Sequence, residues 1–213
     1  MIVAIDGPAG AGKSTVARRL AVQLGFRYLD TGAMYRAVTW LAMQRGVPLW
    51  ENESLGELAR ENPVVFDERG RVRIGGTDVT ASIRQSRIDR QVPVVARHPA
   101  VRAVMRERQR ELAEQGDVVI EGRDIGTVVV PDADVKVYLN ADASIRARRR
   151  QAERPDIGAD ALATDLRLRD ESDAARMRPA ADAIQIDTTD LHVEDVVEQI
   201  ERLVHERATA AQP

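Results

Sequence analysis

The first fifteen residues contain the feature that most constrains what this chain can fold into. An apolar run, residues 2–5, is followed by a glycine-rich segment, residues 6–12, and then by Lys13 and Ser14. Apolar side chains then recur at helical spacing, at Val16, Ala17, Leu20 and Leu24. This order of patterns predicts a strand, a glycine-rich loop and a helix.

A loop of this kind is suited to binding phosphate groups. Glycines let successive backbone N–H groups point at phosphate oxygens, and the positive end of the following helix dipole adds to the attraction. Lys13 would then contact the outer phosphates of a nucleoside triphosphate, and the hydroxyl of Ser14 would bind Mg²⁺. The alternatives are a chance match or a glycine turn without a ligand, but the flanking strand and helix are the context that the motif requires. The expected triphosphate-binding residues are Gly7, Pro8, Ala9, Gly10, Ala11, Gly12, Lys13, Ser14 and Thr15.

Length, charge and cysteine content exclude several classes of protein. A chain of 213 residues suits one domain with appended lobes. Its net charge of -3 argues against a sequence-independent nucleic-acid binder. The absence of cysteine excludes disulfides and thiolate metal sites and fits a reducing compartment. No apolar run approaches the length of a membrane span, and the first residues already belong to the predicted strand, so we expect a cytoplasmic protein without a signal peptide.

Strands and helices are expected to alternate along most of the chain. Further strands are predicted at 26–30, 117–120, 135–139 and 184–187. Further helical segments are predicted at 33–44, 55–60, 86–115 (broken by Pro93 and Pro99), 143–153, 161–176 and 193–207. This alternation predicts an α/β fold in which helices cover both faces of a parallel sheet. Ligands bind at the carboxyl ends of such strands, where Asp6, Asp30 and residues 122–124 lie, so we expect these residues to surround one crevice.

Residues 63–84 have a different pattern. Short runs of alternating apolar residues are separated there by glycine-containing turns. This pattern is typical of a small antiparallel sheet. A doubly wound fold does not need such a sheet, so we interpret it as a lobe inserted between two helices.

A triphosphate in the loop needs an acceptor for its terminal phosphoryl group. Hydrolysis requires a positioned water, and transfer to an alcohol favours a carboxylate base. Transfer to a second phosphate needs neither, because a nucleotide monophosphate with a second pKa of about 6 is already deprotonated at neutral pH. The remaining difficulty is repulsion between two polyanions, which guanidinium groups can offset. Arginines follow two predicted strands and occur on the late helix, at Arg36, Arg123, Arg169 and Arg176.

Each of these arginines also has a purely structural interpretation. Arg36 could be a solvated helix residue. Arg123 lies in a glycine-flanked segment at a strand end, which favours a functional role over a plain turn. Arg169, Asp173 and Arg176 are spaced by four and three, so we expect them to share one helix face, where they could also form a salt-bridge ladder. The run 148–150 is typical of a solvated helix face.

The motifs together resemble those of the bacterial-type cytidylate kinases, which belong to the superfamily of P-loop nucleoside monophosphate kinases. The resemblance covers nearly the whole chain and is carried by residues 7–15, 29–36, 122–127, 169–176 and 181–184. It implies one P-loop kinase domain over 1–213, a three-layer sandwich with a five-stranded parallel sheet flanked by helices. Residues 31–100 would form the monophosphate-binding lobe, with the antiparallel insertion near 63–84, and residues 148–160 a short lid.

The resemblance also implies an activity. It is the ATP- and magnesium-dependent phosphorylation of CMP, and of dCMP, to the diphosphate, with Ser14, phosphates and water binding Mg²⁺. The partners would be these small substrates, with no nucleic acid and no membrane, and the protein would be a monomer. Two alternatives are another P-loop kinase, with UMP, AMP or a metabolite as acceptor, and a nucleotide-binding switch that acts through a partner. The acceptor-side arginines argue against the switch, which does not need them.

Residue roles follow from the same resemblance. Catalysis would depend on Lys13, Arg36, Arg123 and Arg176. The CMP-binding residues would be Thr31, Tyr35, Arg36, Arg102, Arg123, Asp124, Arg169, Asp173 and Arg176. Among them Arg169 and Asp173 would lie at the sugar, and Arg102 and Asp124 at the base. A carboxylate and a guanidinium complement the N4 amine and the N3 and O2 acceptors of cytosine, whereas uracil reverses the pattern at positions 3 and 4.

One position departs from the family pattern. Pro93 stands where relatives carry a serine whose hydroxyl helps to bind the base. Proline offers neither a hydroxyl nor a backbone donor, so base discrimination is weaker or a neighbour replaces the contact. The pattern also leaves open which of Arg146, Arg149 and Arg150 act from the lid.

Overall fold

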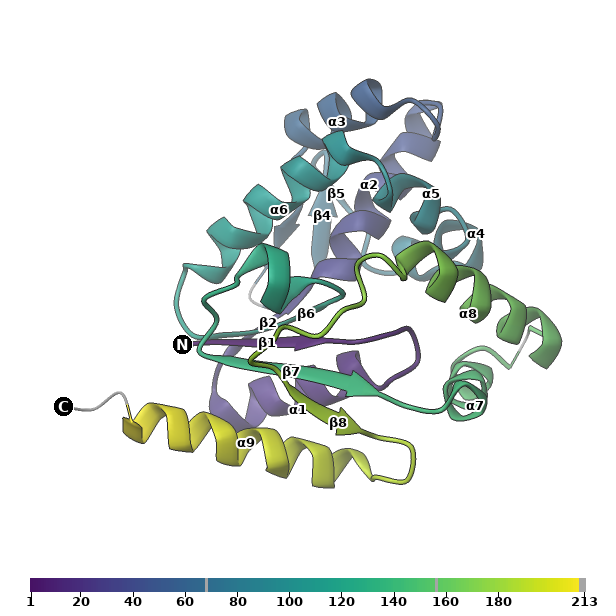
Figure 1. Cartoon of the computed structure of the whole chain (residues 1–213). Helices are drawn as coiled ribbons and strands as arrows, with labels where there is room; N and C mark the ends of the chain where they lie inside the picture. The colour runs from purple at the N-terminus through teal and green to yellow at the C-terminus, as the bar shows by residue number, and fades with distance from the viewer. Residues whose placement is uncertain (68, 156, 211–213) are drawn as a thin grey trace. The chain divides into compact units, whose positions relative to one another are not determined.

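The computed structural model describes residues 1–67, 69–155 and 157–210 of the chain, which form two compact units. One unit comprises Met1–Leu29 and Gln115–Pro213, and the other Asp30–Glu114. Figure 1 shows the path of the chain coloured from the N-terminus to the C-terminus. The expectation of one kinase domain over 1–213 stays a prediction, and each unit is described by itself.

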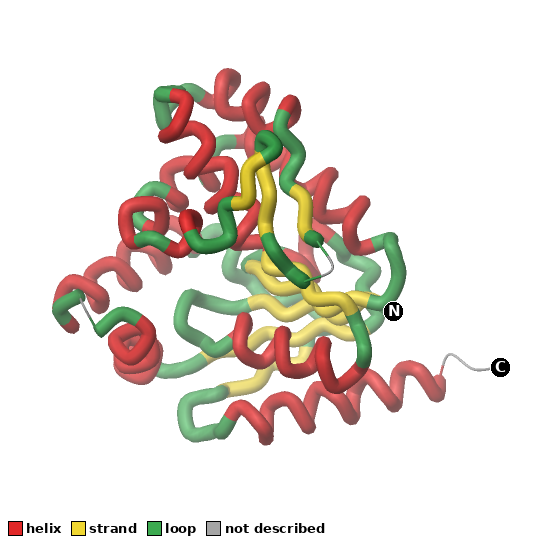
Figure 2. The backbone as a smooth tube through the Cα atoms, turned by 180° about the vertical axis from the view of Figure 1, so that it is seen from behind, coloured by secondary structure: helices red, strands yellow, loops and turns green. Residues whose placement is uncertain are grey.

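The first unit is built on a five-stranded sheet. Its strand order is β2-β6-β1-β7-β8, and the pairs β1–β6, β1–β7 and β7–β8 are parallel. Figure 2 shows the strands in yellow and the helices in red. The strands are β1 (Ile2–Asp6), β2 (Arg27–Asp30), β6 (Val118–Gly122), β7 (Val135–Asn140) and β8 (Ile184–Asp187). Four of these strands and β1 itself match the predicted runs, which confirms the α/β fold with a five-stranded parallel sheet.

Helices follow the strands of this unit. They are α1 (Lys13–Leu24), α7 (Ala143–Glu153), α8 (Ala159–Asp173), α9 (Val193–Ala210) and a short π-helical turn, η2 (Ile125–Val129). The prediction of a helix over 161–176 was wrong at its end, because α8 stops at Asp173. The N–H of Arg176 closes a tight turn on the carbonyl of Asp173, and Pro179 soon follows, which disfavours further helix.

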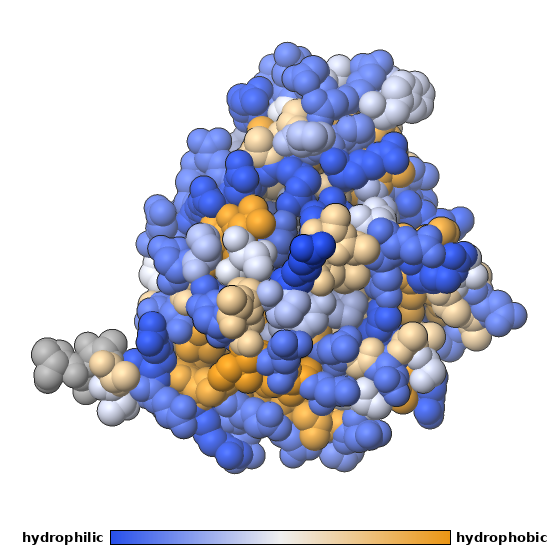
Figure 3. Space-filling view, viewed as in Figure 1, coloured by the Kyte–Doolittle hydropathy of each residue, from blue (hydrophilic) through white to orange (hydrophobic). Residues whose placement is uncertain are grey.

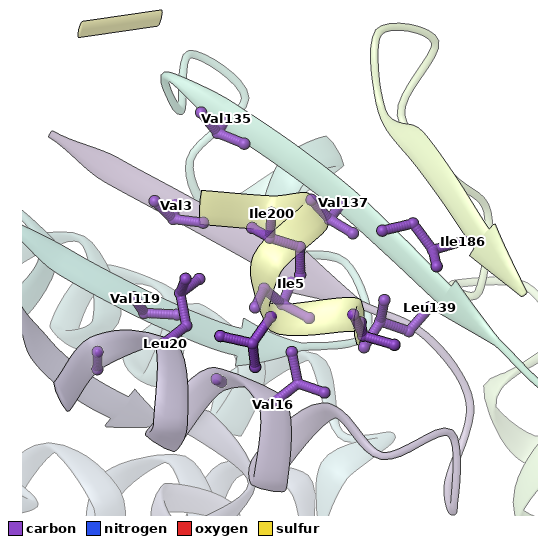
Figure 4. Close-up of a cluster of buried hydrophobic side chains, with 14 of the residues drawn as sticks. Val3, Ile5, Val16, Leu20, Val119, Val135, Val137, Leu139, Ile186 and Ile200 are labelled. Atoms are coloured by element: carbon purple, nitrogen blue, oxygen red, sulfur yellow. The ribbon is translucent and has the colours of Figure 1, made fainter. Parts of the chain in front are cut away.

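The core of this unit lies between the sheet and two helices. Figure 4 shows side chains of α1 and α9 packed against those of β1, β6, β7 and β8, among them Val16, Leu20, Ile200, Val3 and Ile5. Residues 3–5 of β1 are fully buried, as expected for a central parallel strand with both faces covered. The apolar run at the start of the sequence therefore forms the middle of the sheet.

The surface of the first unit follows from the same packing. In Figure 3 hydrophobic residues gather along the side of α9 that faces β7 and β8, while most of the remaining surface in view is hydrophilic. Ile184, on the edge strand β8, is 44% exposed. None of the helices formed by the described residues is both long enough and apolar enough to cross a membrane.

The second unit combines helices with the predicted small sheet. Its helices are α2 (Thr31–Arg45), α3 (Asn52–Glu61), the short 3-10 helix η1 (Ser82–Arg84), α4 (Ser86–Asp89), α5 (Val92–Ala96) and α6 (Pro99–Ala113). Strands β3 (Val65–Phe66), β4 (Val72–Ile74) and β5 (Thr77–Asp78) form an antiparallel sheet in that order. The antiparallel pattern predicted for residues 63–84 is confirmed for the described part, and Glu68 lies outside it.

The breaks predicted at two prolines within the helical segment 86–115 are confirmed, since separate helices lie there. Pro93 lies in the first turn of α5 and Pro99 in the first turn of α6. Proline fits these positions because the first helical residues have no N–H bond within the helix to lose. Both prolines therefore begin helices, and the missing donor of Pro93 leaves no gap in the helical bonding.

The core packing predicts a difference between two valines. Val197 on α9 is 1% exposed, whereas Val22 on α1 is 79% exposed. Val197→Ala removes two buried methyl groups and should lower the free energy of unfolding by about 2 kcal/mol, measured by urea denaturation. Val22→Ala makes the same replacement on a helix, where alanine has the higher helix propensity, and removes no buried group. It should therefore leave the free energy of unfolding unchanged or slightly higher. Equal losses in the two variants would contradict the assigned core.

Candidate functional site

The glycine-rich loop, residues 7–12, runs from the end of β1 to the start of α1. A side chain at Gly7, whose φ is 147°, would place Cβ 2.1 Å from the carbonyl oxygen of Leu139 on β7. At Gly10, with φ 79°, Cβ would lie 2.9 Å from Cβ of Arg146 on α7. Glycine is therefore required at both positions by conformation and by space. The other predicted triphosphate-binding residues lie in this loop and in the first turn of α1: Pro8, Ala9, Ala11, Gly12, Lys13, Ser14 and Thr15.

Arg146 braces one side of the loop. It is buried on α7, and its Nη1 donates to the carbonyl of Ala9 at 3.1 Å. The same guanidinium forms a bidentate ion pair with Asp170 on α8, at 3.1 and 2.7 Å, and its Nε donates to the carbonyl of Ala141. All of these bonds fix the guanidinium in one orientation, so Arg146 links α7, α8 and the loop.

Arg149 braces the loop through Thr188. Its Nη1 and Nη2 donate to the hydroxyl and the carbonyl of Thr188, at 2.9 and 2.6 Å. The Thr188 hydroxyl is buried and lies 3.1 Å from the carbonyl of Ala11, to which it can donate. Arg150 forms an ion pair with Glu153 on its own helix, at 2.7 Å. Two of the three arginines left open by the sequence thus contact the loop or its support.

The predicted lid, residues 148–160, comprises the end of α7, the start of α8 and the segment between them. Asp156, within this segment, lies outside the described residues. The lid therefore stays a prediction.

Lys13 is the first residue of α1 and is buried. Its Nζ donates to the carbonyl of Pro8 at 2.7 Å. Burial, together with the nearby positive charge of Arg123, lowers the pKa of Lys13 to about 7, although the carboxylates of Glu121 and Asp6 act in the opposite direction. The free protein therefore holds this lysine close to its point of half-protonation at neutral pH.

One carboxylate brings two predicted acceptor-phosphate arginines together. Nε of Arg123, which directly follows β6, lies 3.1 Å from Oδ2 of Asp173, and Nη2 of Arg176 lies 2.6 Å from Oδ1. Arg123 also donates to the carbonyl of Gly122 at 3.3 Å. Burial alone would raise the pKa of Asp173, but the two guanidiniums hold that pKa below its usual value. The two cations are thus close together and share one anion.

The expected helix face of Arg169, Asp173 and Arg176 is only partly correct. Arg176 lies in the turn after α8, yet its guanidinium still reaches Asp173. Arg169 forms an ion pair with Asp165, one turn earlier on α8, with Nε 3.2 Å from the carboxylate. Part of the predicted ladder is therefore a structural ion pair, and the other part joins α8 to the end of β6.

Asp124 is buried beside the phosphate-binding loop's own strand. Its backbone leads into the turn η2, whose first two N–H groups, of Ile125 and Gly126, each donate to one oxygen of Asp6 at 2.8 Å. Burial raises the pKa of Asp6, although these two amides favour the charged form. The end of β1 is therefore bonded directly to the segment that carries Asp124.

Several polar residues of this unit were not singled out from the sequence. Glu121 is buried near the end of β6, accepts a bond from the hydroxyl of Tyr28 at 2.5 Å, and acts on the pKa of Lys13. The sequence could have indicated Glu121 as a candidate only through its position near the carboxyl end of the strand beside β1. Asp170 and Thr188 gave no local signal, because their partners are far away in sequence.

The second unit has its own cluster of charges around Asp30. Asp30 caps α2 by accepting the N–H of Ala33 at 2.8 Å, and it forms an ion pair with Arg84 at 2.8 Å. Arg36, on the first turns of α2, lies 3.9 Å from the same carboxylate, and its Nε lies 2.9 Å from Oδ1 of Asp89 on α4. The structure thus adds Arg84 and Asp89, which the sequence did not indicate, to the predicted Arg36.

The charges of this cluster balance one another. Burial would raise the pKa of Asp30, but Arg36 and Arg84 together lower that pKa below its usual value. Thr31 is buried and Tyr35 is half-buried on the same first turns of α2. The predicted acceptor residues of α2 are therefore gathered at its N-terminal end.

The predicted CMP-binding residues are divided between the two units. Arg102 lies on α6 in the second unit and is half-buried. The second unit also holds Thr31, Tyr35 and Arg36, and the first unit holds Arg123, Asp124, Arg169, Asp173 and Arg176. The crevice expected to unite them remains a prediction.

The sequence model of the family described as "Cytidylate kinase" matches residues 3–206. The chain belongs to this family. A cytidylate kinase of Geobacillus kaustophilus (strain HTA426) is 46% identical and is aligned over 96% of both chains. One of Desulfitobacterium hafniense (strain Y51) is 44% identical over 96% of this chain and 93% of the relative.

A longer relative shows the same region as part of a larger protein. A bifunctional pantoate ligase/cytidylate kinase of Synechococcus sp. (strain JA-3-3Ab) is 46% identical over 99% of this chain. The chain spans 42% of the length of that relative, in contrast to the nearly full-length matches above. The match therefore corresponds to less than half of the bifunctional protein.

Solved structures of other kinases share the fold. A shikimate kinase from Bacteroides thetaiotaomicron superposes with a TM-score of 0.53 at 17% identity, covering 96% of this chain and 98% of its own. A gluconokinase from Sinorhizobium meliloti 1021 superposes with a TM-score of 0.54 at 14% identity, covering 99% and 97%. At these identities the likeness concerns the fold alone.

The pKa of Lys13 predicts proton uptake on nucleotide binding. At pH 8 most Lys13 side chains are neutral in the free protein, and the phosphates of ADP should restore their charge. Calorimetry of ADP binding in buffers of different ionisation enthalpy should show uptake of close to one proton per site at pH 8. Lys13→Arg, which is always charged, should bind ADP without this uptake. Equal uptake by both proteins would show that another group is the source.

Proposed function

We propose that this protein transfers the terminal phosphoryl group of MgATP, bound at residues 7–15, to CMP, and to dCMP, giving ADP and the nucleoside diphosphate. The observation that carries the proposal is the pairing of two arginines with Asp173. Arg123 directly follows β6, and Arg176 follows α8. Gly122, which precedes Arg123, pairs in register with Asp6 at the start of the phosphate-binding loop. Two guanidiniums therefore lie beside the donor loop, where a second phosphate needs them.

Charge neutralisation is the main task of the protein in this reaction. The acceptor phosphate of CMP is already deprotonated at neutral pH, so no general base is required. Lys13, charged again in the presence of phosphates, and the loop N–H groups would stabilise the transferring group. Arg123 and Arg176 would hold the acceptor phosphate in line and offset the repulsion between the two nucleotides.

Asp173 has a different role with and without the acceptor. In the free protein its two oxygens hold Arg123 and Arg176. An incoming phosphate would take over these guanidiniums and leave the carboxylate to accept bonds from the ribose hydroxyls. Arg169, anchored to Asp165, would lie at the same sugar. The carboxylate thus keeps the two cations in place until the substrate arrives.

The second unit would supply further contacts to CMP. Arg36, with Thr31 and Tyr35 on the same turns of α2, would bind the acceptor phosphate, and Arg102 would act with Asp124 on the cytosine base. Arg36 is held by Asp89 through its Nε and lies beside Asp30, and an incoming phosphate would compete with these carboxylates for its guanidinium. The backbone and side chain of Pro93 offer no donor to the base, so Arg102 and Asp124 would carry the discrimination.

Magnesium would be bound mainly through the nucleotide. The Ser14 hydroxyl is exposed in the first turn of α1, next to the loop, and oxygen ligands of this kind suit Mg²⁺. The buried carboxylates of Asp6 and Glu121 favour positive charge near Lys13, whereas burial and Arg123 oppose it, so the phosphates themselves would supply most of the attraction for the ion. The ion would neutralise charge on the phosphates.

The remaining expectations belong to the same proposal. The enzyme would act as a monomer in the cytoplasm, without nucleic acid or membrane partners, and residues 148–160 would close as a lid over the nucleotides. Residues 31–100 would form the monophosphate-binding lobe of one domain.

A direct assay tests the proposed acceptor. ATP, magnesium and the protein should release ADP fastest with CMP or dCMP, and at least about tenfold more slowly with UMP, because uracil presents an acceptor to Asp124. AMP and GMP serve as controls for purine acceptors. Equal rates with CMP and UMP would exclude base reading by Asp124, and no turnover with any acceptor would favour a nucleotide-binding switch.

Arg123→Ala tests the role of the arginines. The variant should lose about a hundredfold or more in kcat, because a cation that stabilises the transferring charge is missing. Its free energy of unfolding should change by less than about 1 kcal/mol, since Asp173 keeps Arg176 as a partner. Arg167→Ala removes an exposed arginine paired with Glu171 on α8 and should match the wild type in both measurements. A kcat near wild type for Arg123→Ala would refute the proposed role.

A further inference from the structure

Asp6 makes an unusual connection for the last residue of a strand. It directly precedes the phosphate-binding loop, and its side chain is buried. Its two carboxylate oxygens accept the N–H groups of Ile125 and Gly126, each at 2.8 Å, across a separation of more than a hundred residues. The loop that holds the donor and the segment after β6 are therefore joined by one side chain.

The two bonds fix the turn η2 in both position and rotation. A single bond would leave the turn free to pivot, whereas two consecutive amides on two oxygens of one carboxylate define its direction. The carbonyl of Asp124 accepts the N–H groups of Val128 and Val129, which closes the turn on itself. Because the turn is closed, fixing its first residues also fixes the backbone direction of the two residues that precede it.

Arg123 and Asp124 are those preceding residues. Arg123 reaches Asp173 with its side chain, while Asp124 is buried and begins the turn. Burying the Asp6 carboxylate is costly unless its bonds are satisfied, and a neutral apolar residue would end a strand at lower cost. We therefore attribute the presence of a carboxylate at Asp6 to its two bonds with η2 rather than to stabilisation of the strand β1.

We propose that Asp6 is a positioning residue that sets Arg123 and Asp124 relative to the phosphate-binding loop, and so couples the acceptor-binding segment to the donor loop. The role of these two residues toward CMP rests on the proposed function. The connection itself depends only on the bonds between Asp6 and η2.

Asp6→Asn tests the bonds between Asp6 and η2 separately from nucleotide binding by the phosphate-binding loop. Asparagine has the same size, but its amide nitrogen faces one of the two N–H groups, so one bond is lost. The KM for CMP should rise by at least about tenfold, as expected for one lost bond to a charged group. The affinity for ADP, measured by calorimetry without Mg²⁺, should change much less than the KM for CMP, because the loop backbone is unchanged and only a longer-range charge effect on Lys13 remains.

Asp134→Asn is the matched control. Asp134 accepts the N–H of Ile2 at 2.7 Å, which is the same type of bond at the opposite end of β1. This variant should leave both the KM for CMP and the affinity for ADP unchanged. An equal loss of CMP and ADP binding in Asp6→Asn, or no loss of either, would overturn the proposed positioning role.

Amide hydrogen exchange of the wild-type protein tests the connection without any substrate. The amides of Ile125 and Gly126 should exchange as slowly as those of β6, because both are bonded and buried around Asp6. Exchange as fast as that of exposed loops would overturn the proposal even where Asp6→Asn fails to fold. Absence of CMP turnover in the wild type would refute the proposed function, and the exchange result would still decide on the connection.

Discussion

The parallel register of β1 and β6 is the constraint on which the rest of the first unit depends. It places Asp6 opposite Gly122, so that two chain segments leave the sheet side by side at its carboxyl edge. One segment becomes the glycine-rich loop and α1, and the other carries Arg123 and Asp124 into η2. A shift of the register would move both segments apart along the strands, because neighbouring residues of a strand are roughly 3.3 Å apart. Sheet pairing thus determines which chemical groups are neighbours.

The loop depends on support from elements that come much later in the chain. Arg146 donates a hydrogen bond to the carbonyl of Ala9, and the hydroxyl of Thr188 lies within hydrogen-bond distance of the carbonyl of Ala11. Bonds to these carbonyls hold the loop backbone in place, and a fixed backbone keeps the N–H groups that would bind phosphate oxygens in a constant position. Removing a buried guanidinium with several partners would leave Asp170 without its bidentate partner, which is costly in a partly buried site. The geometry of a short motif is therefore a property of the folded unit.

Local patterns of the sequence were sufficient for much of this structure. The strand, loop and helix of the first residues follow from periodicity and glycine, and the helix over 143–153 has the observed bounds. The small sheet over 63–84 is likewise a local pattern of short strands and turns. The end of α8 was misjudged, because the spacing of Arg169, Asp173 and Arg176 continues a helical pattern that the turn at Arg176 interrupts.

Partners in ion pairs were much harder to predict than the residues themselves. From the sequence, Arg146 is one of three arginines that could act from the lid, and only the packing of α7 against α8 reveals Asp170 as its partner. Arg84 and Asp89 belong to a cluster with Asp30 and Arg36 because the short helices of the second unit return to the start of α2. Such contacts join residues distant in sequence, so neither spacing nor composition indicates them. The candidate arginines could be chosen from the sequence, but their environments could not.

The environments have a common feature that bears on how such a site works. In each unit the arginines proposed to bind the acceptor phosphate are already paired with carboxylates: Arg123 and Arg176 with the half-buried Asp173, and Arg36 with the buried Asp89. Two neighbouring guanidiniums without an anion would repel each other and destabilise the folded state. A bound phosphate must displace or share these carboxylates, so part of its attraction is offset and its affinity is limited. A kinase that must also release its phosphorylated product gains from this limit, because an interaction that binds substrate and product too tightly slows turnover.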